Sequence, residues 1–157
     1  MHEPSEENGF MPDHVSLLLD SYHALTGKHL IAPDHKTEMA KAAYDAPFVL
    51  LSHGMEQDPI LNYGNRSGQR LFAMTWDRLT STPSRFTAEA PNRAERESLL
   101  KRVTENGYID DYSGIRIAAD GRRFVIRNAT VWNVSDAAGR KIGQAAAFSE
   151  WEDLPQG

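Results

Sequence analysis

The sequence YIDDYSGIRIAADGRRFVIRNATVWNVSDAAGRKIGQAAAFSEW runs from Tyr108 to Trp151 and contains two turn signals. Asp120-Gly121 is a dipeptide typical of tight β-hairpin turns, and residues 136–139 form a second turn cluster that ends in glycine. We therefore predict three long antiparallel strands, which span Tyr108–Ala118, Arg122–Val134 and Lys141–Trp151.

Alternation along the middle strand predicts a sheet that is apolar on both faces. Side chains of a strand point to opposite faces in turn. Strict alternation would place one set on one face: Phe124, Ile126, Asn128, Thr130 and Trp132. It would place the other set opposite: Val125, Arg127, Ala129 and Val131. Each face then needs a cover, and we expect central helices on one side and an amphipathic helix on the other.

The segment upstream of these strands supplies the central helices and two more strands. Leu99, Leu100 and Val103 form the apolar face of a helix that ends at Asn106-Gly107, and Asn92 with Glu95 resembles a capping box at its start. Two short helices are expected after caps at Asn65 and Thr75. Short apolar runs at 48–54 and 60–63 predict the first two strands, which makes five in all.

The first third of the chain predicts two further helices. Apolar residues recur at helical spacing from Val15 to Leu25, after an N-cap expected at Asp13 and before a stop expected at Gly27. A second helix is expected from a cap at Asp34 until Pro47. We therefore divide the chain into a flexible N-terminus (1–12), a helical extension packed on the sheet (13–46) and a main domain (47–153).

Composition excludes several classes of protein. The chain has 157 residues, a net charge of −5 and no Cys, so one domain is expected, without disulfides or Cys-based metal sites. The apolar runs are far shorter than the roughly 20 residues that span a bilayer, and the acidic start is unlike a secretory signal. Arginines are matched by acids, which argues against nucleic-acid binding. We expect a cytoplasmic protein that binds neither membranes nor nucleic acid.

Six spaced segments resemble one known family. They are Ala46–Gly54 (APFVLLSHG), Ile60–Asn65 (ILNYGN), Pro83–Arg85 (PSR), Ile109–Gly114 (IDDYSG), Thr130–Asn133 (TVWN) and Gly143–Ala146 (GQAA). These segments are similar to those of the MEKHLA domain, which is PAS-like, and the resemblance covers most of the chain. It implies an α+β fold: a five-stranded antiparallel sheet with short helices on one face and an N-terminal helical extension.

The resemblance also implies a role. The MEKHLA family includes stand-alone bacterial proteins similar to this one and the C-terminal domain of plant class III homeodomain–leucine-zipper transcription factors, where it is regarded as a sensory and interaction module. This chain lacks the basic region and zipper of the plant proteins, so DNA binding is not implied. We expect a non-enzymatic module for sensing or regulation.

The residue types restrict the cofactor. A Cys-linked flavin adduct or a Cys-linked chromophore is excluded because the chain has no Cys. Haem is disfavoured because no His follows His53, and no His pair has the spacing that places two imidazoles on one helical face. The cofactor is otherwise unknown, and no metal is expected.

Aromatic walls with a few polar anchors are typical of small-molecule sites. We predict walls from Tyr63, Trp76, Tyr112 and Trp132. We predict anchors from Arg85, Arg116, Asn128 and Gln144, and the arginines suggest an anionic ligand. Asn128 would need hydrogen-bond partners if it lay buried among Phe124, Ile126 and Trp132.

Three functions remain open at this point. The first is a ligand-binding sensor that signals through a partner or its own dimer. The second is an interaction module with a filled core, which forms a homodimer through the N-terminal helix or the sheet. The third is a small enzyme that uses Asp110 or Asp111 with His53 for proton transfer. It fails if these side chains lie more than a hydrogen-bond chain apart.

Overall fold

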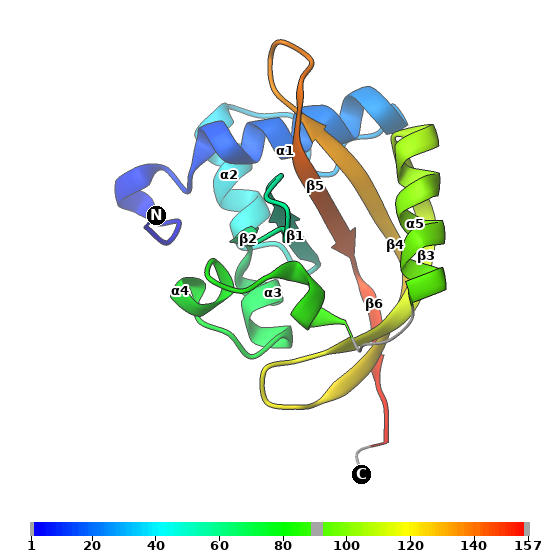
Figure 1. Ribbon diagram of the computed structural model, residues 1–157. Helices are drawn as coiled ribbons and strands as arrows, with labels where there is room; N and C mark the ends of the chain where they lie inside the picture. The colour runs from blue at the N-terminus through cyan, green and yellow to red at the C-terminus, as the bar shows by residue number, and fades with distance from the viewer. Residues whose placement is uncertain (1, 89–92, 156–157) are drawn as a thin grey trace.

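A computed structural model of the chain describes residues 2–88 and 93–155, and it contains one antiparallel sheet covered by helices on both sides (Figure 1). The strands are β1 (Val49–His53), β2 (Leu61–Gly64), β3 (Tyr108–Ile117), β4 (Arg123–Ser135), β5 (Lys141–Phe148) and β6 (Glu150–Asp153). Their order is β2-β1-β5-β4-β3, and β6 pairs with β4. The predicted α+β fold is confirmed.

The helices connect and flank these strands. They are η1 (Glu6–Asn8), α1 (Pro12–Thr26), α2 (Lys36–Tyr44), α3 (Arg66–Leu71), α4 (Trp76–Leu79), η2 (Ser84–Thr87) and α5 (Arg93–Asn106).

The last predicted strand, Lys141–Trp151, differs from the observed one. It is interrupted at Ser149, and β6 continues β5 along β4 in the same register.

The core has two halves, one on each face of the sheet. The outer face carries Leu50, Trp132, Val134, Ala145 and Ala147, which pack with buried residues of α1 and α2. The inner face carries Val49, Leu51, Phe124, Ile126 and Val131, which pack with residues of α3 and α5. Two covers, as predicted, are therefore present, and α1 packs along β4 of its own chain.

A bend between the two halves of β4 corrects our assignment of faces. Asn128 has a φ of 54°, in the left-handed region that few non-glycine residues adopt. The pairing of β3 with β4 is irregular on both sides of Tyr112↔Ala129, which places a bulge in each strand, at 110–111 and at 127–128. Ile126 and Ala129 consequently lie on the same face. The prediction of strict alternation is wrong beyond Asn128, because one extra residue turns the strand over.

Helix caps were predicted correctly where a side chain closes the first turn. Oδ1 of Asn65 accepts from the Gly68 N–H at 3.0 Å, and Thr75 Oγ1 accepts from the Arg78 N–H at 3.3 Å. Asp13 and Asp34 are not caps: α1 begins at Pro12, whose missing N–H and fixed φ suit that position, and α2 begins after His35. The predicted capping box depends on Asn92, which lies outside the described residues.

Asn65 joins the two halves of the core. Its buried amide donates to the carbonyls of Ala43 (3.0 Å) and Phe48 (2.8 Å) and accepts from the N–H of Leu50 (3.1 Å). These contacts tie α2, β1 and α3 together. Every polar atom of this fully buried amide is thus satisfied, as burial requires.

Candidate functional site

The eight side chains predicted to form one site lie in three places. On the outer face are Tyr63, Trp76 and Trp132. On the inner face are Tyr112, Arg116 and Gln144. The remaining two, Arg85 and Asn128, are exposed or near the surface. A single pocket cannot include all of them, because the sheet separates the first group from the second.

The three aromatic residues of the outer face are part of the core. Tyr63 and Trp76 are in edge-to-face contact, with ring centroids 5.9 Å apart. The indole N–H of Trp132 donates to the carbonyl of Leu18 at 3.1 Å, and its ring packs edge-on against Tyr22 at 5.0 Å. Burial raises the pKa of the Tyr63 phenol. These residues attach α1 and α4 to the sheet.

The two surface residues are engaged with neighbouring acids. Nε of Arg85 lies 3.1 Å from both carboxylate oxygens of Asp58, and its guanidinium covers the ring of Phe86 at 4.2 Å. The Asn128 amide donates to Glu150 at 3.1 Å. Asn128 does not lie buried among Phe124, Ile126 and Trp132, because the bulge turns its side chain toward solvent.

A polar cluster lies on the inner face where β1, β5 and β4 are adjacent. The Gln144 side chain is only 8% exposed and donates to Asn133 Oδ1 at 3.3 Å. Asn133 in turn donates to the carbonyl of Val103 on α5, also at 3.3 Å. His53 is the cross-strand partner of Gln144 on β1, and its Nδ1 lies 2.9 Å from the Gly54 carbonyl. We call Gln144, Asn133 and His53 the inner polar cluster.

Asn133 was missed in the set of predicted anchors. It is a polar residue between two apolar ones, Trp132 and Val134, and it belongs to a segment on which the family resemblance rests. Its register partner is Gln144. The sequence therefore marks Asn133 as an unusual polar residue in an apolar strand. The pairing register, which brings its amide beside that of Gln144, could not be predicted from the sequence.

A second group on the inner face combines an aromatic ring and a cation. The Arg116 guanidinium lies over the ring of Tyr112 at 5.0 Å. Gly114 lies between them on the same face of β3, and a side chain there would meet the Tyr112 hydroxyl. One isolated bridge precedes η2, between Ile60 and Pro83, and another follows it, between Ala88 and Arg116. This part of the chain therefore crosses from the β2 edge to the β3 edge.

The two inner-face groups are two strands apart. Gln144 is on β5 and Tyr112 is on β3, with β4 between them. Neighbouring strands are about 4.8 Å apart, and the partners of these two residues on β4, Asn133 and Ala129, are also about 13 Å apart along the strand, so roughly 16 Å separates Gln144 from Tyr112. Amides, an imidazole, a cation and a phenol thus share one face, which suits recognition of an organic molecule by hydrogen bonds and ring contacts.

The proton-transfer hypothesis is wrong for the residues that it named. Both Asp110 and Asp111 are exposed on β3, and Asp111 accepts two hydrogen bonds from Arg102, at 2.6 and 2.8 Å. His53 is on β1, which β5 and β4 separate from β3. Three strand spacings amount to roughly 14 Å, beyond the reach of a direct proton transfer.

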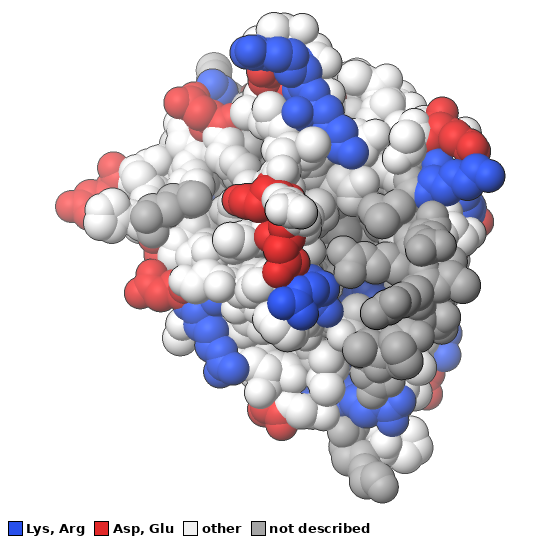
Figure 2. Space-filling view, viewed as in Figure 1, with Lys and Arg blue, Asp and Glu red and all other residues white. Residues whose placement is uncertain are grey.

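The described residues contain neither a metal-ligand cluster nor a helix that could cross a membrane. No group of three or more His, Cys, Asp or Glu gathers as a metal site would require within residues 2–88 and 93–155. None of the helices in that same part of the chain has both the length and the apolar character to cross a bilayer. On the face shown in Figure 2, acidic and basic side chains are interspersed.

Solved structures place this architecture among PAS domains. A PAS domain of a protein from Colwellia psychrerythraea superposes with a TM-score of 0.62 at 14% identity, over 77% of this chain and 98% of that one. The photo-excited blue-light photoreceptor Vivid gives a TM-score of 0.62 at 14% identity, over 88% and 95%. An RNA-binding light-oxygen-voltage receptor gives 0.60 at 22% identity, over 74% of this chain but only 31% of the receptor. The fold is PAS-like.

The amino-acid sequence identifies the family of PAS-like domains to which the chain belongs. Residues 12–153 match the MEKHLA domain, and the chain belongs to that family. This confirms the resemblance. A search of curated proteins found no match.

Proposed function

We propose that this MEKHLA domain is a sensory or regulatory module that binds a small organic ligand between the inner face of the sheet and the helices η2 and α5. The observation that carries the proposal is the inner polar cluster. Amides are usually placed in an apolar core only where their hydrogen bonds can be satisfied. Here two of them lie on adjacent strands beside an imidazole, on the face that α5 covers.

The chemistry of the ligand follows from the groups that face it. Carboxamides both donate and accept, so the inner polar cluster suits a ligand with both kinds of group. An anionic ligand was expected from Arg85 and Arg116. Arg85 is paired with Asp58, whereas Arg116 lies on the inner face over Tyr112. Any anionic group of the ligand would therefore bind at the Tyr112 end.

The structural neighbours support a sensory role. Two of them are described as light receptors, one a blue-light photoreceptor and one an RNA-binding light-oxygen-voltage receptor. A light-driven adduct on Cys is excluded here because the sequence has no Cys. The stimulus that we propose is therefore the presence of the ligand.

Native mass spectrometry of the purified protein tests this function. We expect a retained mass, or else a thermal shift with a member of a metabolite library, because a ligand that binds only the folded state stabilises it. Gln144→Leu, which removes the amide at similar volume, should weaken binding by about tenfold, the value of one or two hydrogen bonds.

Asn128→Gly is the matched control. It also removes an amide, but from the exposed bulge, where the φ of 54° suits glycine. Binding should be unchanged in this variant. No retained mass and no thermal shift for the natural chain, or equal binding by both variants and the natural chain, would overturn the proposal.

The alternative of a homodimer through the N-terminal helix needs a different surface. Leu18 and Leu19, the centre of the apolar stripe of α1, are 1% and 6% exposed. They pack in the outer half of the core of their own chain. The stripe is thus occupied, and a contact between copies would have to use another part of the N-terminal region.

A further inference from the structure

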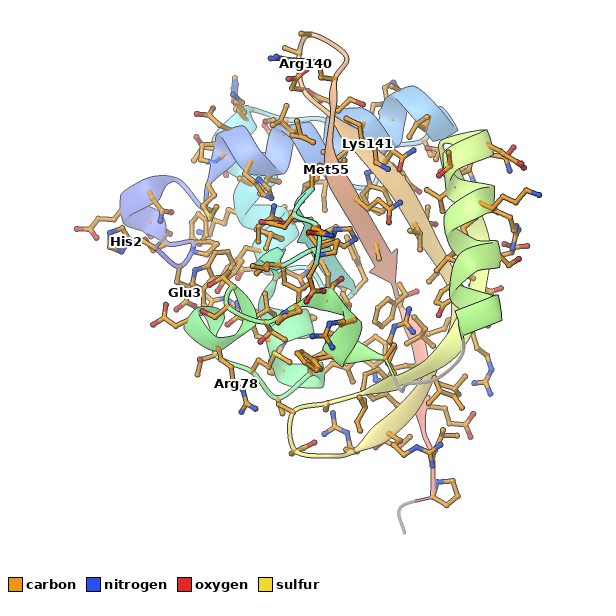
Figure 3. The ribbon with its side chains drawn as sticks, in the orientation of Figure 1. His2, Glu3, Met55, Arg78, Arg140 and Lys141 are labelled. Atoms are coloured by element: carbon orange, nitrogen blue, oxygen red, sulfur yellow. The ribbon has the colours of Figure 1, made fainter. Side chains whose placement is uncertain are left out.

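Residues 2–11 form an extension that we call the N-terminal arm. Figure 1 shows it beside α2, outside the layers formed by the sheet and its covers. In Figure 3, His2 lies at the outer end of the arm and Glu3 on the side toward the rest of the molecule. The arm is closed on itself, since the Asn8 amide donates to the Glu3 carbonyl at 2.9 Å and Asn8 Oδ1 accepts from the Ser5 N–H at 2.9 Å.

The arm binds to a site on α2 and α3 that we call the Tyr44 seat, made of Lys41, Tyr44 and Arg66. The Tyr44 hydroxyl donates to Glu3 Oε2 at 2.6 Å, and Lys41 forms an ion pair with Glu6 at 3.3 Å. The Phe10 ring is 4% exposed and lies 6.0 Å from the Tyr44 ring. Three kinds of contact, a charged hydrogen bond, an ion pair and an aromatic contact, therefore hold the arm.

The seat is built without the arm. The Tyr44 hydroxyl also accepts from Gln69 at 2.9 Å, the Arg66 guanidinium lies 4.8 Å from the Tyr44 ring centroid, and Arg66 is paired with Asp45 at 2.7 Å. All of these groups come from α2, α3 and the turn after α2. An open groove of about 650 Å³ lies between the arm and the seat and is lined by Glu3, Pro4, Ser5, Glu6, Glu7 and Phe10 of the arm and by Lys41, Asp45 and Arg66. The arm can therefore leave while the seat keeps its shape.

The connection between the arm and α1 is strained. Gly9, Phe10 and Met11 have φ values of 63°, 64° and 59°, so three consecutive residues are left-handed. Only the first is glycine, and left-handed backbone is unfavourable for residues with a Cβ, which adopt it singly rather than in runs. Residues Gly9–Met11 would thus be less strained in an extended backbone conformation. In that conformation the arm would no longer reach the Tyr44 seat of its own chain.

We propose that the N-terminal arm is exchanged between two copies of this chain, so that the arm of each protomer binds the Tyr44 seat of the other. The contacts of Glu3 with Tyr44 and of Glu6 with Lys41 are the same in both states, and hence this part of the fit seen within one chain is retained in the dimer. The difference lies in the hinge at Gly9–Met11, which relaxes when it opens. Strained short hinges favour this type of exchange.

The geometry is compatible with a two-fold dimer. Three residues in extended conformation span about 10 Å, so the two seats would lie close to the N-termini of both α1 helices. Each protomer gives one arm and one seat, which makes the contact isologous. This dimer uses no residue of the inner polar cluster, and the proposal is independent of the ligand-binding function.

Two hinge variants should shift the monomer–dimer equilibrium in opposite directions. Met11→Gly removes strain from the closed arm and should weaken dimerisation by about tenfold, whereas Gly9→Val adds strain and should strengthen it by about tenfold. Sedimentation over a range of concentrations measures both, on the full chain. Arg78→Ala, an exposed change on α4 (Figure 3), is the control and should have no effect.

A cross-link identifies whose arm is bound. A zero-length carbodiimide joins Lys41 to Glu6 across their ion pair, and a mixture of ¹⁴N and ¹⁵N protein, refolded together, distinguishes links within one chain from links between two. We expect Lys41–Glu6 peptides of mixed isotope composition in the dimer fraction. A natural chain that stays monomeric together with Gly9→Val, or a dimer whose Lys41–Glu6 links are all of one isotope, would overturn the proposal.

Discussion

The outer and inner faces of the sheet differ in what their polar atoms bind. On the outer face, Trp132 donates to the backbone of α1 and its neighbours are aromatic or aliphatic. On the inner face, Gln144 and Asn133 bind each other and the end of α5. The large aromatic residues that suggested a pocket are therefore mostly structural. The amides of the inner face are the better guide to function.

Trp132→Ala should cause the largest change in the free energy of unfolding, because it removes a buried side chain that holds α1 on the outer face of the sheet and leaves the inner face unchanged. Deletion of a fully buried indole costs about 3–5 kcal/mol of unfolding free energy in other cores, and here the bond to the Leu18 carbonyl is lost as well. Urea denaturation measures this. A loss below about 1 kcal/mol would mean that α1 is not held through this residue.

Tyr63→Phe should have a smaller effect of the opposite sign. The Tyr63 hydroxyl is buried, and it has no hydrogen-bond partner among the described residues. Its removal should raise the unfolding free energy by about 1 kcal/mol, since burial of an unpaired hydroxyl is unfavourable. A destabilised variant in the same denaturation experiment would instead show that the hydroxyl is paired.

The smallest expected effect is a loss of folding stability at acidic pH that is caused by the side chain of His14. His14 on α1 lies beside the Tyr63 ring, 5.8 Å away, and its Nε2 is 3.1 Å from Ser52 Oγ. Burial lowers the pKa of His14 below the ordinary 6.5. The unfolded chain therefore takes up this proton first as the pH falls, and the folded state is destabilised between about pH 6.5 and the lower pKa of the folded state.

Urea midpoints at pH 7.5 and pH 5 test this, with His14→Gln as the comparison. Gln can still donate to Ser52 but does not titrate. The natural chain should lose more stability over this interval than the variant. The pKa values of Asp13 and Asp136 are lowered from 3.8, by Lys36 and by the Arg140 N–H respectively, so those groups act at more acidic pH. Equal slopes for both proteins would refute the assignment to His14.

The fold could be predicted because its signals are local. Asp120-Gly121 forms the turn between β3 and β4, and Asn65 and Thr75 close the helices that they precede. The site could not be predicted in the same way. Whether a strand residue faces inward depends on the register over its whole length, and the bulge at Asn128 occurs without a glycine. The pairing of Arg85 with Asp58, which are 27 positions apart, has no local signal either.

The two bulges that flank Tyr112 compensate each other. The register of β3 on β4 at Ile109↔Val131 is the same as at Gly114↔Ile126, although each strand has gained one residue between these points. Deletion of Asn128 alone would thus exchange the surroundings of Trp132 and Asn133, moving an indole beneath α5 and an amide beneath α1. Which side chains of β4 face the structural outer core and which face the inner polar cluster therefore depends on one extra residue in the middle of that strand.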